Sequence, residues 1–371
     1  MLMDIGMNKS EITVKAEYFD LRAICKSGQV FRMYEREPGV FDVYSADRHV
    51  RIRECPACED GAGAGTEACG GDAGAGTEAG EAADCYRPAL LRFLCSADEF
   101  ENYWRRYFDL DRDYAGIVRN ALSDPETGSF IREACSVCGG IRILHQNIWE
   151  MMISFIISQQ KQIPSIRKCI EALCERYGER RAAVSASHGS QSAGSPAAGS
   201  QAAGPAPDGS QAAGSLAAAG GQAAGWYTFP TPEAIAAGGP EGLKGLSLGY
   251  RERYIYETAV QYLDHGVSDE CLEAMDYESA KKYLMTFTGI GEKVADCILL
   301  FGAGFTDAFP IDTHIKDILY REAVSHNMAG LPDRDHISMA RYEELSHELF
   351  DRYAPNRGIV QQWMFAYETA H

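Results

Sequence analysis

The sequence predicts an α+β protein in which an N-terminal antiparallel β domain packs on an all-helical domain made of two helical halves. Residues 18–53 contain short runs of β-branched and aromatic residues with partial alternation and Pro-Gly turn signals, which indicates antiparallel strands. From about residue 130 onward, apolar residues recur at the spacing of one helix face. We therefore expect a β domain over residues 1–125 and a helical domain over residues 126–371.

The region between the strands and the helical domain, residues 86–120, carries a mixed pattern that ends in a helix. In the helical domain, several segments have apolar residues three or four positions apart. We expect the last of these segments to pack back on the core. The expected helices are residues 148–157, 163–177, 251–264, 279–287, 292–301, 313–322, 342–352 and 358–369.

Two low-complexity stretches, residues 59–84 and 185–225, interrupt the two domains. The first nearly repeats DGAGAGTEA, and the second repeats GSQSAG or GSQAAG from residues 189, 199 and 209. Such stretches bury too little apolar surface to offset the conformational entropy of the chain. We therefore expect both to be flexible loops inserted into folded domains.

The composition describes a globular but strongly acidic chain. Its 371 residues are 46% hydrophobic, which excludes wholesale disorder, and 53 acidic against 35 basic residues give a net charge of −18. Such a charge should repel DNA, because binding to phosphates depends on lysine and arginine. Residues 59–84 carry seven acidic residues and no lysine or arginine, so without them the net charge falls only from −18 to −11.

The sequence also indicates the cellular compartment in which the protein is expected. The N-terminus lacks the continuous apolar core of a signal peptide, and no apolar run reaches the roughly 18 residues of a membrane span. We therefore expect a cytoplasmic protein without a membrane segment. In that compartment the 12 cysteines should be reduced thiols.

The segment that carries chemical information is residues 279–319. One helix should end near Phe287, Gly289 and Gly291 allow a tight turn, and a second helix should begin at about Glu292. This arrangement is a helix–hairpin–helix, which binds a DNA phosphate through main-chain N–H groups and needs no net positive charge. An ordinary helix C-cap is the alternative interpretation of the glycines.

Two ionisable residues follow this turn. Lys293 falls in the first turn of the second helix, where the helix dipole and partial desolvation would lower the pKa of the amine and make it nucleophilic. The alternative is a solvated surface lysine. Asp312, in FPIDTHIK, is placed to cap a helix, and a carboxylate held by helix amides can also stabilise positive charge on a sugar.

At these residues the sequence resembles the helix–hairpin–helix Gly/Pro…Asp superfamily of base-excision DNA glycosylases. The stretch TGIGEKVADCILLFG followed by FPIDTHI carries the signature, and its lysine is typical of the bifunctional glycosylase/lyase branch. KVADC, LKGLSLGYRERY and SGQVFR resemble segments of the 8-oxoguanine DNA glycosylase/lyase group in the same order, and GIVQQWMFAYE fits more loosely. The resemblance covers nearly the whole chain apart from the two insertions.

The resemblance implies catalytic roles for two residues. Lys293 would attack C1′ of a flipped nucleotide, expel the base and leave a Schiff base that permits β-elimination. Asp312 would stabilise the developing oxocarbenium charge and assist proton transfers.

The resemblance also implies a base pocket. The Gly28 carbonyl would accept the N7 hydrogen of 8-oxoguanine, Cys297 and Phe365 would sandwich the base, and Gln361 would bind its pairing edge. His314 would contact a phosphate near the lesion. Without the family, Gly28 would be a hairpin glycine, Cys297 and Phe365 core residues, and Gln361 a surface amide.

One turn departs from the family pattern. Eukaryotic members use an asparagine-rich turn and an arginine to read the cytosine opposite the lesion. The corresponding turn here is SQQKQIPS, with Gln160, Lys161 and Gln162 at the asparagine positions and Ser165 at the arginine position, while Arg251 remains. We expect Gln160, Lys161 and Arg251 to contact DNA, the alternative being surface charges, and strict selectivity for cytosine is not expected.

We expect neither a metal nor a cofactor. Iron–sulfur glycosylases of this fold carry four cysteines after the catalytic aspartate, whereas the last cysteine here is Cys297. Cys55/Cys58 and Cys135/Cys138 form CxxC pairs that could make a zinc site, but unpaired thiols are the preferred interpretation.

The sequence therefore predicts a bifunctional, bacterial-type 8-oxoguanine DNA glycosylase with AP-lyase activity. We expect a monomer whose partner is double-stranded DNA containing an oxidised purine, acting in the cytoplasm on the nucleoid. One alternative is an alkyladenine-type or broad-specificity glycosylase on the same fold. Another is a non-catalytic DNA-binding protein that keeps the helix–hairpin–helix for phosphate alone.

Overall fold

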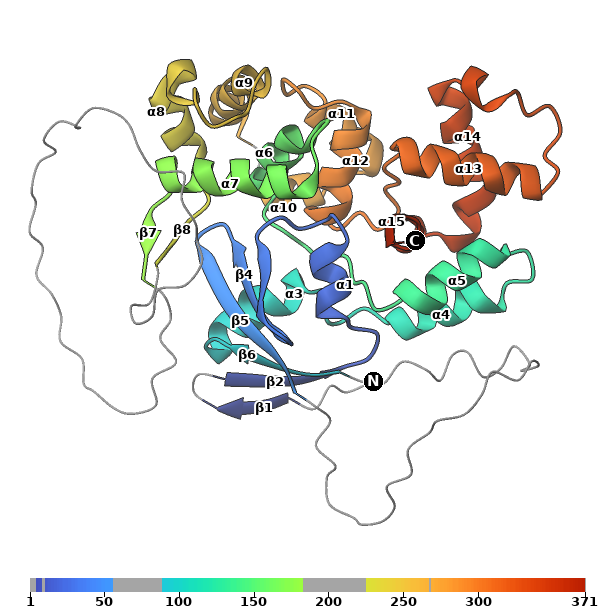
Figure 1. The fold of residues 1–371 in the computed structure, drawn as a ribbon, viewed down its shortest axis with the longest axis horizontal. Helices are drawn as coiled ribbons and strands as arrows, with labels where there is room; N and C mark the ends of the chain where they lie inside the picture. The colour runs from blue at the N-terminus through green and yellow to red at the C-terminus, as the bar shows by residue number, and fades with distance from the viewer. Residues whose placement is uncertain (1–4, 9–10, 56–88, 183–224, 267, 371) are drawn as a thin grey trace, which may run out of the picture.

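The computed structural model of the 371-residue chain describes residues 5–8, 11–55, 89–182, 225–266 and 268–370 (Figure 1). The two low-complexity stretches predicted to be loops lie outside these residues, except for Gly225. No helix within the described ranges is long and apolar enough to cross a membrane.

The N-terminal part is a six-stranded antiparallel sheet in the order β1-β2-β6-β5-β4-β3. Its core face is apolar. On that face Ile12 and Ile52 lie opposite Phe93 on the neighbouring strands, and all three side chains are fully buried. The strands are β1 (Ile5–Asn8), β2 (Glu11–Ala16), β3 (Met33–Glu37), β4 (Val40–Ser45), β5 (Arg48–Cys55) and β6 (Ala89–Leu94).

The strand prediction for residues 18–53 is confirmed for β3 to β5 and wrong for α1 (Leu21–Lys26), a helix. This short helix forms because the Asp20 carboxylate accepts a hydrogen bond from the Ala23 N–H at 2.8 Å, which caps its first turn. The helix then buries Leu21 and Ile24 against the sheet. The apolar residues of this short run therefore form the buried face of a helix and do not belong to a strand.

The described residues that follow β6 are mainly helical, as predicted. α7 and α12 have the predicted bounds, and the other predicted helices are found with ends shifted by a few residues. The longer helices are α4 (Tyr114–Ser123), α5 (Ser129–Cys138), α6 (Ile148–Ser158), α7 (Ile163–Tyr177), α8 (Pro232–Gly242), α9 (Arg251–His265), α11 (Tyr277–Leu284), α12 (Glu292–Phe301), α13 (Thr313–Ser325), α14 (Met339–Phe350) and α15 (Arg357–Ala370). Shorter elements are α2 (Ala97–Glu99), α3 (Arg105–Tyr107), α10 (Asp269–Glu273), β7 (Arg180–Arg181) and β8 (Trp226–Tyr227).

The helices form two groups above the sheet (Figure 1). One group contains α6 to α12, and the other joins α4 and α5 to the C-terminal helices α13 to α15. Within the second group the Trp363 indole donates to the Ile141 carbonyl at 2.8 Å, and the Tyr367 hydroxyl donates to the Glu133 carboxylate at 2.7 Å. The last helix thus packs back on the core, and the second group is built from segments far apart in the sequence.

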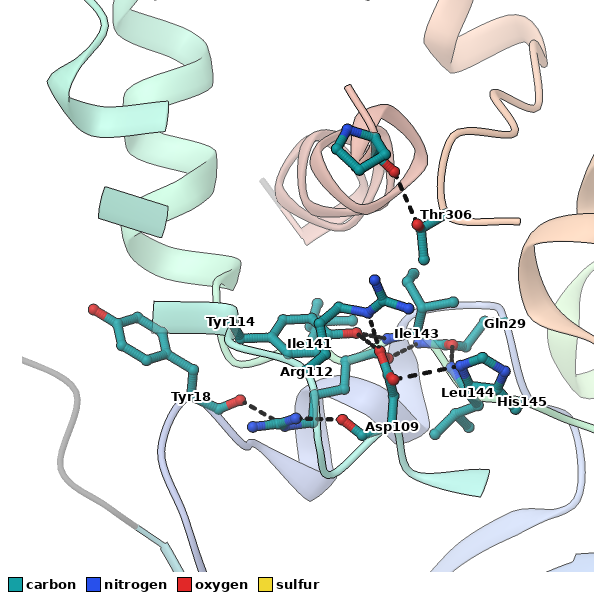
Figure 2. Close-up of polar contacts among 12 residues, drawn as sticks. Tyr18, Gln29, Asp109, Arg112, Tyr114, Ile141, Ile143, Leu144, His145 and Thr306 are labelled. Atoms are coloured by element: carbon teal, nitrogen blue, oxygen red, sulfur yellow. Dashed lines mark hydrogen bonds and ion pairs between the residues drawn. The ribbon is translucent and has the colours of Figure 1, made fainter. Parts of the chain in front are cut away.

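A buried extended segment, residues 139–147, joins the sheet to both helix groups (Figure 2). The Arg142 guanidinium, 2% exposed, donates to the carbonyls of Tyr18 at 3.2 Å and Asp109 at 2.6 Å. Burial opposes ionisation of the Asp109 carboxyl, but His145 and Arg112 lower its pKa overall. These contacts hold the buried extended segment in place. This segment in turn holds residues near the site.

Candidate active site and nucleic-acid interface

The helix–hairpin–helix is formed by α11, the turn after Leu284, and α12. Gly289 has φ +85°, and a β-carbon there would lie 2.7 Å from the Tyr254 ring, so glycine is required on both counts. Gly291, the N-cap of α12, has φ −97°, and a β-carbon there would meet no heavy atom of the surrounding protein within 4 Å. The second glycine therefore leaves open space at the helix N-terminus.

Side chains of neighbouring elements hold the hairpin backbone in place through hydrogen bonds. The Thr288 N–H donates to the Gln261 side chain and the Thr258 hydroxyl donates to the Thr288 carbonyl, both at 2.8 Å. The Gln159 side-chain amide donates to the Gly289 carbonyl at 2.8 Å. Because the first N–H groups of a helix have no partner within it, the exposed start of α12 is suited to bind an anion such as a DNA phosphate.

The turn between α6 and α7 lies beside the hairpin, since Gln159 bridges the two. Gln160 is exposed and has φ +52°, and the Lys161 ammonium donates to the Ser247 carbonyl at 2.8 Å. Arg251 is only 6% exposed, and its guanidinium donates to the carbonyls of Leu248 and Gln159. The predicted DNA contact of Arg251 stays a prediction, because in this structure the side chain braces the turn from inside the protein.

Sequence reasoning missed an exposed aromatic residue on this surface. Tyr250 is 49% exposed, and the Arg251 guanidinium lies 4.4 Å from the centre of its ring. Its ring also makes an edge contact with Tyr254, the residue that packs under Gly289. A large exposed aromatic side chain next to an anion-binding turn suits contact with bases, but the sequence carries no local signal of its exposure.

A small pocket next to the start of α12 brings six of the predicted site residues together. Its open space is about 340 Å³. The residues that line it are Ser27, Gly28, Phe155, Lys293, Cys297, Phe301, Pro310, Asp312, Gln361, Gln362 and Phe365. They come from the segment after α1, from α6, α12 and α15, and from the loop before α13, so both helix groups and the N-terminal part contribute.

Lys293 lies in the first turn of α12, and its ammonium is 5.7 Å from the centre of the Phe155 ring. The predicted lowering of its pKa is wrong: Cys297 raises the pKa most and Asp312 adds to this, and together they outweigh the desolvation that lowers it. Burial raises the pKa of the Cys297 thiol itself to about 11. The neighbours of Lys293 in the pocket therefore favour the charged form of its amine.

Asp312 is the N-cap of α13. Its carboxylate accepts a hydrogen bond from the Ile315 N–H at 2.9 Å, as the sequence predicts for this helix start. The side chain is partly buried and lines the same pocket as Lys293. The helix cap therefore holds the carboxylate at the wall of the pocket that Lys293 also lines, and the catalytic role of Asp312 stays a prediction.

The opposite side of the pocket is formed by Gly28, Gln361 and Phe365. Gly28 has φ +80°, and a β-carbon there would lie 3.5 Å from the Phe365 ring, so any side chain would enter the gap between them. Gln361 is 3% exposed, and within the described residues its side-chain oxygen is buried without a hydrogen-bond partner. A buried unpaired acceptor in a pocket wall favours a ligand that supplies an N–H group.

His314 lies at the edge of this pocket. It is exposed in the first turn of α13, and its ring makes an edge contact with the Phe365 ring at 5.8 Å. Cys297 is 3% exposed and lines the pocket one helical turn after Lys293. Phe155 and Phe301, which the sequence analysis missed, stack at 5.8 Å and 17° to form an apolar wall. Their sequence pattern is that of ordinary core residues.

Of the two cysteine pairs, only Cys135 and Cys138 both lie within the described residues. Cys135 and Cys138 are buried on α5, where burial raises their pKa values to about 12 and about 11, while Cys58 lies outside the described residues. In the part of the chain that the structure describes, no three or more His, Cys, Asp or Glu side chains are placed to hold a metal ion.

Comparisons with known proteins agree with this geometry. Residues 11–152 match the family model described as 8-oxoguanine DNA glycosylase, N-terminal domain, and residues 153–330 match that of the HhH-GPD superfamily base excision DNA repair protein. The N-glycosylase/DNA lyase of Saccharomyces cerevisiae is 27% identical over 237 residues, which are 61% of this chain and 52% of that protein. The chain thus spans about half the length of this curated relative.

Two solved structures share the fold over the whole chain. A structure of MBOgg1 in complex with a low-affinity DNA ligand has a TM-score of 0.70 and 26% identity and covers 100% of this chain and 99% of that one. The Clostridium acetobutylicum 8-oxoguanine glycosylase/lyase, in complex with double-stranded DNA containing cytosine opposite 8-oxoG, has a TM-score of 0.69 and 23% identity and covers 100% and 98%. Because the two family models match adjoining ranges that together span residues 11–330 and include the hairpin, this chain belongs to the 8-oxoguanine DNA glycosylase family of the HhH-GPD superfamily of base-excision DNA repair proteins.

Proposed function

We propose that this protein is a bifunctional DNA glycosylase and AP lyase that excises 8-oxoguanine from duplex DNA. The observation that carries the proposal is the pocket, where Lys293, Asp312, Gly28 and Gln361 converge beside the hairpin. A hairpin that only bound phosphate would need neither the lysine nor the carboxylate in a closed pocket. We also propose that the protein acts as a monomer on nucleoid DNA in the cytoplasm.

Binding begins at the hairpin. The free amides at the start of α12 hold a phosphate, while Gln160 and Lys161 on the neighbouring turn and His314 at the edge of the pocket contact the strands. Extrusion of the target nucleotide costs a few kcal/mol, which stacking and hydrogen bonds in the pocket offset. Binding through amides and a few placed side chains explains how an acidic chain can act on DNA.

The pocket then selects the base. Phe365 and Cys297 provide the faces between which a planar base fits. The unpaired side-chain oxygen of Gln361 accepts an N–H donor of the pairing edge of the base. The Gly28 carbonyl accepts the N7 hydrogen, which 8-oxoguanine has and guanine lacks. A site built to accept a particular N–H discriminates strongly against an analogue without it.

Lys293 carries out the covalent step. Its neutral amine attacks C1′, the bond from C1′ to the base nitrogen breaks, and the base leaves with that electron pair and a proton. Asp312 stabilises the positive charge that develops on the sugar. The C1′–O4′ bond of the resulting aminal then breaks, O4′ takes up a proton, and C1′ forms the Schiff base with Lys293. Loss of a proton from C2′ forms the C2′–C3′ double bond, breaks the C3′–O bond and expels the 3′ phosphate by β-elimination.

The test is borohydride trapping on a duplex that contains 8-oxoguanine opposite cytosine. Wild type should release the base and form a covalent adduct, Lys293→Gln should form no adduct, and Asp312→Asn should be slowed in base release. Full base release and trapping by Lys293→Gln would refute the mechanism. Release of 3-methyladenine without trapping would identify an alkylbase glycosylase, and binding without any release would identify a DNA-binding protein.

A further inference from the structure

Buried glutamine side chains hold the peptide unit before Gly28 and the peptide unit after Gln29. The Gln362 amide of α15 donates to the Ser27 carbonyl at 2.7 Å, and the Gln146 amide donates to the Gln29 carbonyl at 2.8 Å. The two side chains are 3% and 5% exposed, so water competes little for these bonds. Gly28 lies between the two anchored carbonyls and lines the pocket.

A third glutamine ties the same segment to the buried extended segment (Figure 2). Gln29 is fully buried, and its amide nitrogen donates to the Ser27 hydroxyl at 3.0 Å and to the Arg142 carbonyl at 2.9 Å. Its amide oxygen accepts the Leu144 N–H at 2.9 Å. These bonds use most of the hydrogen-bonding capacity of the Gln29 side chain, which fixes residues 27–29 against residues 142–144.

Glycine needs such support more than any other residue. With no side chain and a left-handed backbone, Gly28 has no rotamer or packing contact of its own to limit its motion. A hydrogen-bond acceptor discriminates between two ligands only if it is held in place before the ligand arrives. The Gly28 carbonyl must be held rigidly to select the base, but Gly28 has no side chain that could limit its motion.

We propose that Gln29, Gln146 and Gln362 are positioning residues that hold the Gly28 carbonyl in place to read the base. The inference rests on the proposed function and deepens it. The three side chains come from the N-terminal part, from the segment before α6 and from α15, so base selection depends on how these three parts meet. Gln29 and Gln146 do not line the pocket that holds Lys293, so we expect the chemistry of Lys293 not to depend on them.

The experiment compares two substrates on each purified full-length variant. Single-turnover release of 8-oxoguanine needs base recognition, whereas cleavage and borohydride trapping at a preformed abasic site need only Lys293. Gln146→Met keeps the side-chain volume and removes the donor to the Gln29 carbonyl. We expect 8-oxoguanine release to fall about five- to tenfold, the effect of one buried hydrogen bond. We expect abasic-site cleavage to stay within about twofold of wild type.

Two further variants make the test selective. Gln29→Met removes the hydrogen bonds to the Ser27 hydroxyl and the Arg142 carbonyl, should give the same pattern, and serves if Gln146→Met does not fold. Thr306→Val is the matched control, because Thr306 is also buried and donates one hydrogen bond, to the Pro355 carbonyl at 2.8 Å, without touching residues 27–29. It should lower thermal stability and leave the ratio of the two rates unchanged.

The outcomes distinguish a failure of the positioning role from a failure of the proposed function. A folded variant that keeps wild-type 8-oxoguanine release, or that loses both activities equally, would overturn the positioning role. A wild-type protein that neither releases 8-oxoguanine nor is trapped at an abasic site would overturn the proposed function itself. A change in the rate ratio shared by Thr306→Val would mean that general loosening, and not the glutamines, controls base selection.

Discussion

Asp312 combines a structural and a chemical role that substitution can separate. Its carboxylate caps α13 through the Ile315 N–H at 2.9 Å and lines the pocket with Lys293. Asparagine keeps the capping oxygen and removes the charge, whereas alanine removes both. The pair Asp312→Asn and Asp312→Ala therefore isolates the charge from the cap.

The magnitudes differ enough to be distinguished. Asp312→Ala should cost about 0.5–2 kcal/mol of stability, the worth of an N-cap, and Asp312→Asn only a few tenths. A negative charge about 4 Å from a developing cation contributes about 4 kcal/mol at an effective dielectric constant of about 20, or roughly a thousandfold in rate. Both variants should therefore lose catalysis, while only the alanine variant loses stability.

The assay combines thermal unfolding with single-turnover base release. Asp276 supplies the matched control, because its carboxylate caps α11 through the Ser279 N–H at 3.0 Å and does not line the pocket. Asp276→Ala should lose stability like Asp312→Ala and keep its activity. Base release by Asp312→Asn within tenfold of wild type would show that the carboxylate acts only as a cap.

Four other variants or conditions should respond in ways that the geometry dictates. Gly28→Ala should lose about 1–2 kcal/mol of stability, measured by denaturant unfolding, because φ at this residue is +80°. The variant should also release the base far more slowly, because the added methyl group enters the gap between residue 28 and the Phe365 ring. Since the pKa of Lys293 is raised and the neutral amine is the nucleophile, single-turnover rates should increase with pH across the neutral range; a flat profile would contradict this. Burial raises the pKa of Glu150 to about 7, so the folded state binds a proton more tightly than the unfolded state and stability should fall as pH increases from about 4.5 to 7. Glu150→Gln, which keeps an acceptor for the Ala46 N–H, should flatten that pH dependence in calorimetric scans. Finally, the salt dependence of DNA binding should be shallower than that of a basic DNA-binding domain, and a slope equal to many phosphate contacts would reveal a hidden basic face.

The helices of the site could be predicted from the sequence because their signals are local. α7 and α12 have the predicted bounds: apolar residues keep helical spacing, and Gly178, Gly291 and Gly302 mark their ends. α1 was missed because six residues are too short to show a period, and its Asp20 cap was the remaining signal. The place of β6 between β2 and β5 also has no local signal, because pairing joins strands that are distant in the chain.

The fold class and the helix–hairpin–helix turn could be inferred from the order of the residues, since turns and caps are encoded over a few positions. The family resemblance implied that Lys293 and Asp312 act together, and the structure places both in one pocket. The direction of the Lys293 pKa required the folded arrangement, because Cys297 and Asp312 outweigh the desolvation that lowers it. The residues that hold Gly28 also emerged only from the folded chain. Gln362 is 335 residues from Ser27, and a hydrogen bond over that separation exists only once the chain has folded.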